Sequence, residues 1–181
     1  MSVIYLNAAH TASSPGAVWH GSTEHEEALS FCHALKRELL SLDGGLEIIV
    51  TEGNFPLPYV MHDDFLFVFH KGINKKNENC RGAEIYVKDT DSAATQYRAF
   101  RLLEALCGKR LKYRGVHIAG KGTPFRLFVN TAARNAYLIM AGFMESVHDR
   151  SAFLHHEKEI AEGLSREILR IYKEKTDEDY T

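Results

Sequence analysis

Residues 65–69, Phe65-Leu66-Phe67-Val68-Phe69, form an uninterrupted apolar run that ends at His70. A short run in which every residue is apolar is typical of a strand buried on both faces of a sheet. A second, mostly apolar run, residues 3–9, is interrupted only by Asn7 and leads into His10. The sequence therefore predicts two buried strands that each lead directly into a histidine.

Strand-like and helix-like patterns alternate along the rest of the chain. Thr23 and Glu26 form a capping box, and apolar residues at three- and four-residue intervals behind them predict a helix over 24–42. This alternation predicts a three-layer α/β/α fold with a mixed, mostly parallel sheet of about five or six strands. Further helices are expected over 92–107 and 149–175 (one or two helices), and further strands over 46–51, 82–87, 126–129 and 136–140. Residues 11–23 are expected to form a loop, and residues 109–124 are a basic, glycine-containing stretch with no predicted helix or strand.

Length and composition are those of an ordinary globular domain. The 181 residues, 45% hydrophobic and 25% charged, predict a single domain over 1–175 with a frayed tail over 176–181. A net charge of -2 gives no basic footprint for nucleic acid, and no apolar stretch approaches the roughly 20 residues of a membrane span. We see no secretory signal at the N-terminus, and the three cysteines form no CxxC pair.

Three polar residues occupy positions where functional sites of α/β proteins gather, at the carboxyl ends of the strands. His10 and His70 each follow a predicted strand, and Glu24 opens the helix that the loop after His10 leads into. If the two strands are neighbours, the three side chains can converge on one point. Two histidines and one glutamate supply the three protein ligands of a catalytic zinc ion, with the fourth position left to water. Each residue alone also has an ordinary reading, as a satisfied polar group at a strand end or a helix N-terminal charge.

Seven segments in order resemble the zinc-dependent N-acetylmuramoyl-L-alanine amidases of bacterial cell walls and phage endolysins. The resemblance covers nearly the whole chain and implies that His10, Glu24 and His70 bind Zn²⁺. It also implies a peptidoglycan or muropeptide substrate. The matching segments are 3–10, 15–17, Glu24, 65–70, 82–87 (Gly-Ala-Glu-Ile-Tyr-Val), 114–116 (Arg-Gly-Val) and 136–143 (Ala-Tyr-Leu-Ile-Met-Ala-Gly-Phe).

One departure from the family concerns catalysis. The family carries a catalytic glutamate on the last strand, two residues before the glycine of a Gly-Phe turn, and that position here is Met140. A thioether cannot take up or release a proton in this range. Glu145 is our candidate for a substitute base, with His117 and His148 as alternatives. Otherwise the domain is catalytically impaired, or the last strand aligns with the family in a different register.

The function we expect is zinc-dependent hydrolysis of the amide between N-acetylmuramic acid and L-alanine. The alternatives are a catalytically impaired zinc-binding module that recognises the cell wall, and a cytoplasmic zinc amidohydrolase acting on another amide. The lack of a recognisable signal peptide fits a lysin that stays in the cytoplasm until release. Arg114, Lys121 and Arg126 could line a groove for an anionic muropeptide stem, or form a solvated basic loop.

Overall fold

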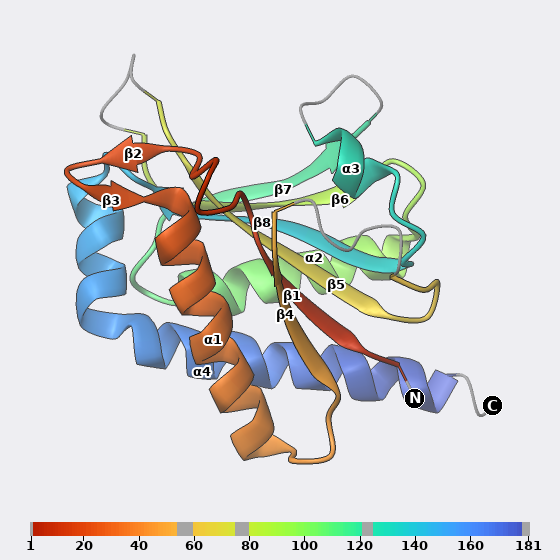
Figure 1. Cartoon of the computed structure of the whole chain (residues 1–181). Coiled ribbons are helices and arrows are strands. Elements are labelled where there is room, and N and C mark those ends of the chain that lie inside the picture. The colour runs from red at the N-terminus through yellow and green to blue at the C-terminus, as the bar shows by residue number, and fades with distance from the viewer. Residues whose placement is uncertain (1, 54–59, 75–79, 121–124, 179–181) are drawn as a thin grey trace.

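The computed structural model of the chain describes residues 2–53, 60–74, 80–120 and 125–178. Its strands are β1 (Ile4–Ala8), β2 (Val18–Trp19), β3 (Ser22–Thr23), β4 (Ile48–Glu52), β5 (Phe65–Gly72), β6 (Ala83–Lys88), β7 (Tyr113–Ala119) and β8 (Asn135–Phe143). Six of them form one sheet in the order β4-β1-β5-β8-β6-β7 (Figure 1). Every pairing in this sheet is parallel except that of β6 with β8. The predicted mixed, mostly parallel sheet is confirmed.

Helices cover the two faces of the sheet unequally. The long helices α1 (Glu24–Leu42), α2 (Ala93–Cys107) and α4 (Val147–Glu178) enclose the larger core on one face with Phe65, Phe67 and Phe69 of β5 (Figure 1). The short helix α3 (Arg126–Val129) and neighbouring segments cover the other face, where Leu66 and Val68 lie in a smaller core. Helices therefore flank the sheet as in the predicted three-layer α/β/α fold, with most of the apolar burial on one face.

The first helix begins where the capping box predicts it. The Thr23 hydroxyl accepts a hydrogen bond from the Glu26 amide, and the Glu26 carboxylate accepts one from the Thr23 amide. These two bonds satisfy backbone donors that an uncapped helix leaves unpaired. The cap fixes the start of α1 at Glu24, at the edge of the sheet where β1 and β5 end.

Three predictions about the connecting segments are wrong. Residues 126–129 form α3 rather than a strand, because the Val129 amide bonds the Phe125 carbonyl and closes a helical turn. The basic stretch 109–124, for which no strand is predicted, contains β7, an edge strand that is exposed along much of its length and so lacks an apolar run. The predicted loop 11–23 contains the β2–β3 hairpin.

The last helix extends the prediction at both ends. It runs from Val147 to Glu178 with a break in helical geometry at His156, which accounts for a pattern that could be read as one or two helices. Among the described residues, no helix is both long enough and apolar enough to cross a membrane.

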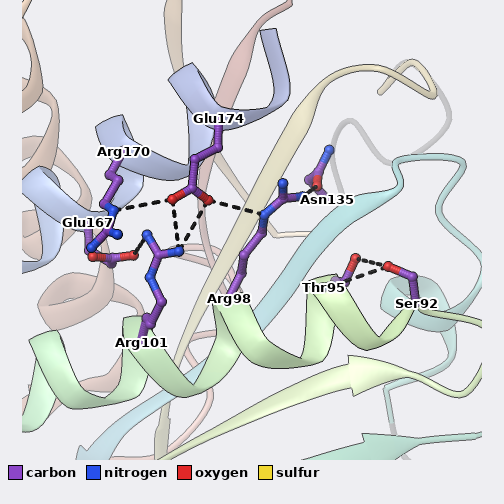
Figure 2. A network of polar contacts seen from close by, with 8 residues as sticks. All are labelled: Ser92, Thr95, Arg98, Arg101, Asn135, Glu167, Arg170 and Glu174. Carbon is purple, nitrogen blue, oxygen red and sulfur yellow. Dashed lines mark hydrogen bonds and ion pairs between the residues drawn. The ribbon is translucent and has the colours of Figure 1, made fainter. Parts of the chain in front are cut away.

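A network of charged side chains joins α2 to α4 (Figure 2). Arg101 of α2 lies between two carboxylates of α4, 2.5 Å from Glu167 and 2.9 Å from Glu174. Arg98, one turn earlier in α2, also pairs with Glu174, at 3.6 Å. The Arg101 and Glu167 side chains are only 12% and 15% exposed, so each needs the opposite charge of the other to offset its lost hydration.

We expect Arg101→Met to lower the free energy of unfolding by about 2 kcal/mol, because it leaves the partly buried Glu167 without its cation and removes one of the arginines that pair with Glu174. Urea denaturation measures this change. The control is Arg166→Met, since Arg166 is 66% exposed and pairs only with Glu162 among the described residues; it should change stability by less than about 0.5 kcal/mol. Equal losses in the two variants would contradict the assignment.

Candidate metal centre

The candidate site lies where β1, β5 and α1 meet at one edge of the sheet. Strands β1 and β5 are parallel neighbours, so both run towards the same edge. His10 follows β1 two residues after its last residue, His70 lies near the end of β5, and Glu24 is the first residue of α1. The condition that the sequence left open, that the two strands be adjacent, is met.

The three predicted ligand side chains converge in the structure. The Nε2 atom of His10 lies 3.2 Å from one carboxylate oxygen of Glu24, and Nδ1 of His70 lies 2.8 Å from the other. The two imidazole rings stand edge to face with centroids 5.4 Å apart. One potential ligand atom from each residue lies within 4.8 Å of the other two.

These distances suit a zinc ion. Zinc bonds to nitrogen and oxygen are about 2.0–2.2 Å long, so neighbouring ligand atoms in a tetrahedral site lie roughly 3.3 Å apart. The 3.2 Å separation of His10 and Glu24 is close to that value. Two imidazoles and one carboxylate also match the donor set of catalytic zinc sites. The residues present therefore fit the metal that the sequence predicts.

Glu24 is a buried carboxylate with several hydrogen-bond donors around it. Its side chain is 6% exposed, and the backbone amides of Ala17 and Lys71 each donate to it at 3.1 Å. Burial raises the pKa of the Glu24 carboxyl, but the hydrogen bond and charge of His70, with the Ala17 amide, outweigh it. The net pKa lies below its ordinary value, which keeps Glu24 ionised and able to bind a cation.

The loop between His10 and Glu24 passes close to both side chains at Gly16. A Cβ atom at this position would lie 2.5 Å from the His10 ring and 2.6 Å from a Glu24 oxygen. Gly16 also has a φ of 74°, a conformation that L side chains rarely adopt. His10 itself has a φ of 67°, so the chain turns sharply after β1. Only a glycine fits at position 16 without displacing the two candidate ligands.

A second set of contacts holds β5 against the start of α1. Lys71 points to the opposite face of β5 from His70, and its ammonium lies 3.0 Å from Glu27 and 3.6 Å from the centroid of the Phe153 ring. Burial lowers the pKa of this ammonium, and the negative charge of Glu27 opposes that effect. Because Glu27 lies one turn after Glu24, this ion pair fixes the helix start against the strand that carries His70.

The remaining candidates for catalysis lie in different places. Met140 of β8 is the Cα partner of His70, so it lies beside this histidine on the same face of the sheet. Glu145 follows β8 and is buried; one of its oxygens accepts the Asn74 amide, and the other has no hydrogen-bond partner among the described residues. His117 lies on the edge strand β7, and His148 is exposed at the start of α4.

Two features that shape this site are not among the site residues predicted from the sequence. Gly16 lies in a loop of small residues, where a glycine between two candidate ligands is a signal for close backbone approach. The Lys71–Glu27 pair has no local signal, because the partners are 44 positions apart in the sequence, and only the packing of β5 on α1 brings them together. Of the basic residues 114, 121 and 126, the first is described on β7, whereas Lys121 and the side chain of Arg126 lie outside the described part of the chain.

We expect Gly16→Ala to weaken zinc binding at least about tenfold, because the added methyl group displaces His10 or Glu24. Competition with a chromogenic chelator measures the affinity, and circular dichroism checks that the fold is retained. Gly44→Ala is the matched control, since Gly44 is exposed and its nearest neighbouring atom would lie 3.9 Å from the new Cβ. An unchanged affinity in Gly16→Ala would contradict the geometry described for this loop.

Comparisons with known proteins relate the whole chain to one group of structures. No protein family model matches the sequence, and no relative is found among curated proteins. The catalytic domain of CwlV, an N-acetylmuramoyl-L-alanine amidase from Bacillus (Paenibacillus) polymyxa var. colistinus, superposes with a TM-score of 0.76 at 17% identity. This match covers 96% of the present chain and 99% of the CwlV catalytic domain.

Two other structures superpose in the same way. The amidase AmiC2 of Nostoc punctiforme has a TM-score of 0.71 at 16% identity, over 95% of this chain and 97% of that one. The catalytic domain of the CD27L endolysin, which targets Clostridia difficile, has a TM-score of 0.74 at 19% identity, over 94% and 98%. The chain therefore has the fold of N-acetylmuramoyl-L-alanine amidase catalytic domains.

Proposed function

We propose that this protein binds one zinc ion through His10, Glu24 and His70 and hydrolyses the amide between N-acetylmuramic acid and L-alanine in peptidoglycan. The observation that carries the proposal is the convergence of these three side chains at the sheet edge, within 4.8 Å of one another. The fold of cell-wall amidase catalytic domains around this cluster supports the choice of substrate. The resemblance of the sequence motifs points the same way.

The protein's own residues supply a preformed and accessible site. The side chains of His10 and His70 are 33% and 21% exposed, whereas Glu24 is nearly buried. A cavity of about 420 Å³ opens beside the cluster and is lined by His10, Gly16, Ala17, Val18, Glu24 and Ile73. A bound zinc ion would lower the pKa of a water molecule and polarise a carbonyl group there. A substrate amide can reach the His10 imidazole and the Glu24 carboxylate from this side.

Met140 is the difficulty for a fully active enzyme. Its register beside His70 is the position at which the resembling family carries a catalytic glutamate. A methionine at this position cannot accept a proton next to the candidate metal. Glu145 remains our candidate for that role, although its buried carboxylate already bonds the backbone of Asn74. The loop after β5 would have to shift for Glu145 to exchange a proton with substrate.

Met140 also favours a second function from a different class. A domain that keeps the metal ligands and loses the acid–base group can bind a cell-wall fragment without cutting it efficiently. In this alternative the zinc ion and the sheet face serve recognition. The two functions differ in turnover and agree in zinc binding and in affinity for the wall.

The purified protein should contain one zinc ion per chain, and His70→Ala should contain none, because two ligands hold zinc much more weakly than three. Peptidoglycan digestion with and without a chelator tests the activity, measured as release of stem peptides from the muramic acid. Chelator-sensitive release supports the amidase. Zinc-dependent wall binding without release supports the recognition module, and activity only on small soluble amides would refute both.

We expect Met140→Glu to raise the rate of peptidoglycan hydrolysis by about 10²–10⁴, the usual contribution of a positioned general base. The measurement is the initial rate of stem-peptide release at saturating zinc. Met140→Gln is the matched control, because a glutamine side chain has nearly the same shape as glutamate and cannot take up or release a proton near neutral pH.

Glu145→Gln tests the remaining candidate in the same assay. If Glu145 is the proton acceptor, this variant loses the residual wild-type turnover while its zinc affinity is unchanged. No gain in Met140→Glu, together with full activity in Glu145→Gln, would place the acid–base chemistry elsewhere.

A further inference from the structure

A second polar cluster lies on the same face of the sheet as the candidate metal centre. Glu84 of β6 accepts hydrogen bonds from the Tyr86 hydroxyl at 2.9 Å and from Nε of Arg114 on β7 at 2.8 Å. The imidazole of His117 lies 3.5 Å from the same oxygen that Arg114 contacts. We refer to these four residues as the Glu84 cluster. The mechanism proposed above uses none of them.

The strand register fixes where the Glu84 cluster lies relative to the metal centre. Met140 is the Cα partner of His70 on one side and of Glu84 on the other. Paired residues on neighbouring strands point to the same face, so His70, Met140 and Glu84 form one row across the sheet. Adjacent strands are about 4.8 Å apart, which puts Glu84 about 10 Å from His70.

One aromatic side chain, Phe125, lies between the two clusters. The ring of Phe125 lies with its centroid 6.0 Å from that of His70 and 4.9 Å from that of Tyr86. The sheet face from the metal centre to Arg114 is thus lined by Met140 and Phe125. An extended peptide advances about 3.3–3.6 Å per residue, so the distance of about 10 Å from His70 to Glu84, the residue that the Arg114 guanidinium contacts, corresponds to about three residues.

Arg114 is held in place yet keeps donors available. Its Nε bonds Glu84, and its guanidinium lies 5.0 Å from the centroid of the Phe143 ring. Among the described residues, no group bonds its two terminal nitrogens, and 30% of the side chain is exposed. The Glu84 side chain is only 9% exposed, so this carboxylate orients Arg114 from within the protein. An arginine fixed in this way offers a planar pair of donors that matches a carboxylate.

The groups next to Arg114 leave its terminal nitrogens available for a ligand carboxylate. Burial raises the pKa of Tyr86 to about 12, and its hydrogen bond to Glu84 acts in the same direction, so the hydroxyl remains protonated. His117 is 43% exposed and lies on the solvent side of the cluster. In the described part of the chain, the only carboxylate in contact with Arg114 is Glu84, whose charge the guanidinium already balances.

We propose that Arg114, oriented by Glu84, binds a carboxylate of the substrate's peptide about three residues from the amide that is cut. This inference rests on the proposed function, because it takes the metal centre as the place of cleavage. It adds to that function a preference for a peptide that carries a carboxylate at this position over one that carries a carboxamide. A simple structural ion pair would instead stabilise the β6–β7 edge and leave ligand choice unaffected.

The test compares two soluble ligands that cannot be cut because they lack the muramoyl group. One is the tripeptide L-Ala-γ-D-Glu-L-Lys with free carboxylates, and the other is the same tripeptide with both carboxylates converted to carboxamides. Isothermal titration calorimetry on the zinc-loaded protein measures the dissociation constants. We expect the wild type to bind the acidic form about tenfold more tightly, as charge-assisted hydrogen bonds to arginine are stronger than neutral ones.

Arg114→Gln should remove this preference and leave the affinity for the carboxamide form and for zinc unchanged. Arg114→Lys, which retains the charge and loses the planar pair of donors, should keep part of it. Arg110→Gln is the matched control, because Arg110 is exposed and pairs with Glu159 of α4; it should behave as wild type.

The outcomes separate this inference from the proposed function. Equal binding of the two tripeptides by the wild type, or a preference that survives in Arg114→Gln, overturns the inference; if peptidoglycan is still cut, the proposed function stands. Failure of the wild type to bind either tripeptide or to cut peptidoglycan overturns both. Loss of zinc affinity in Arg114→Gln would show a structural role and overturn the inference.

Discussion

The carboxylate of Glu24 is the contact on which the geometry of the candidate site depends. It contacts both histidines and accepts hydrogen bonds from the backbone amides of Ala17 and Lys71. Through these contacts it joins the loop after β1, the start of α1 and the end of β5. A carboxylate at a helix N-terminus is stabilised by the helix dipole as well as by these donors. One buried side chain thereby fixes the relative positions of three segments.

The geometry of the candidate site therefore depends on how α1 packs against β5 in the core. The helix that presents Glu24 packs Phe31 against Phe69, next to His70 in the sequence, with the rings edge to face 5.5 Å apart. Lys71 and Glu27 join the same two elements one residue further on. Any change that loosens α1 from β5 therefore also separates the candidate ligands.

Much of this could be predicted from the sequence, because the signals involved are local. The capping box at Thr23 fixes the start of α1, and the apolar runs of β1 and β5 end at the histidines. The edge strand β7 could not be predicted, because its exposed residues show no apolar run. The row of His70, Met140 and Glu84 could not be foreseen either, since it depends on β8 lying between β5 and β6. Sequence separation hides such neighbours until the strand order is known.

Side chains alternate along β5, so neighbouring residues of this strand serve the candidate site and the packing of the core. This limits which insertions and deletions the strand can accept. His70 faces the site, and Lys71, the next residue, faces the helices on the other side. Because side chains alternate with a period of two, inserting or deleting one residue within this strand would send the imidazole into the helical core and the ammonium into the open edge. Length changes in β5 are therefore excluded even where its individual apolar residues can be exchanged for one another.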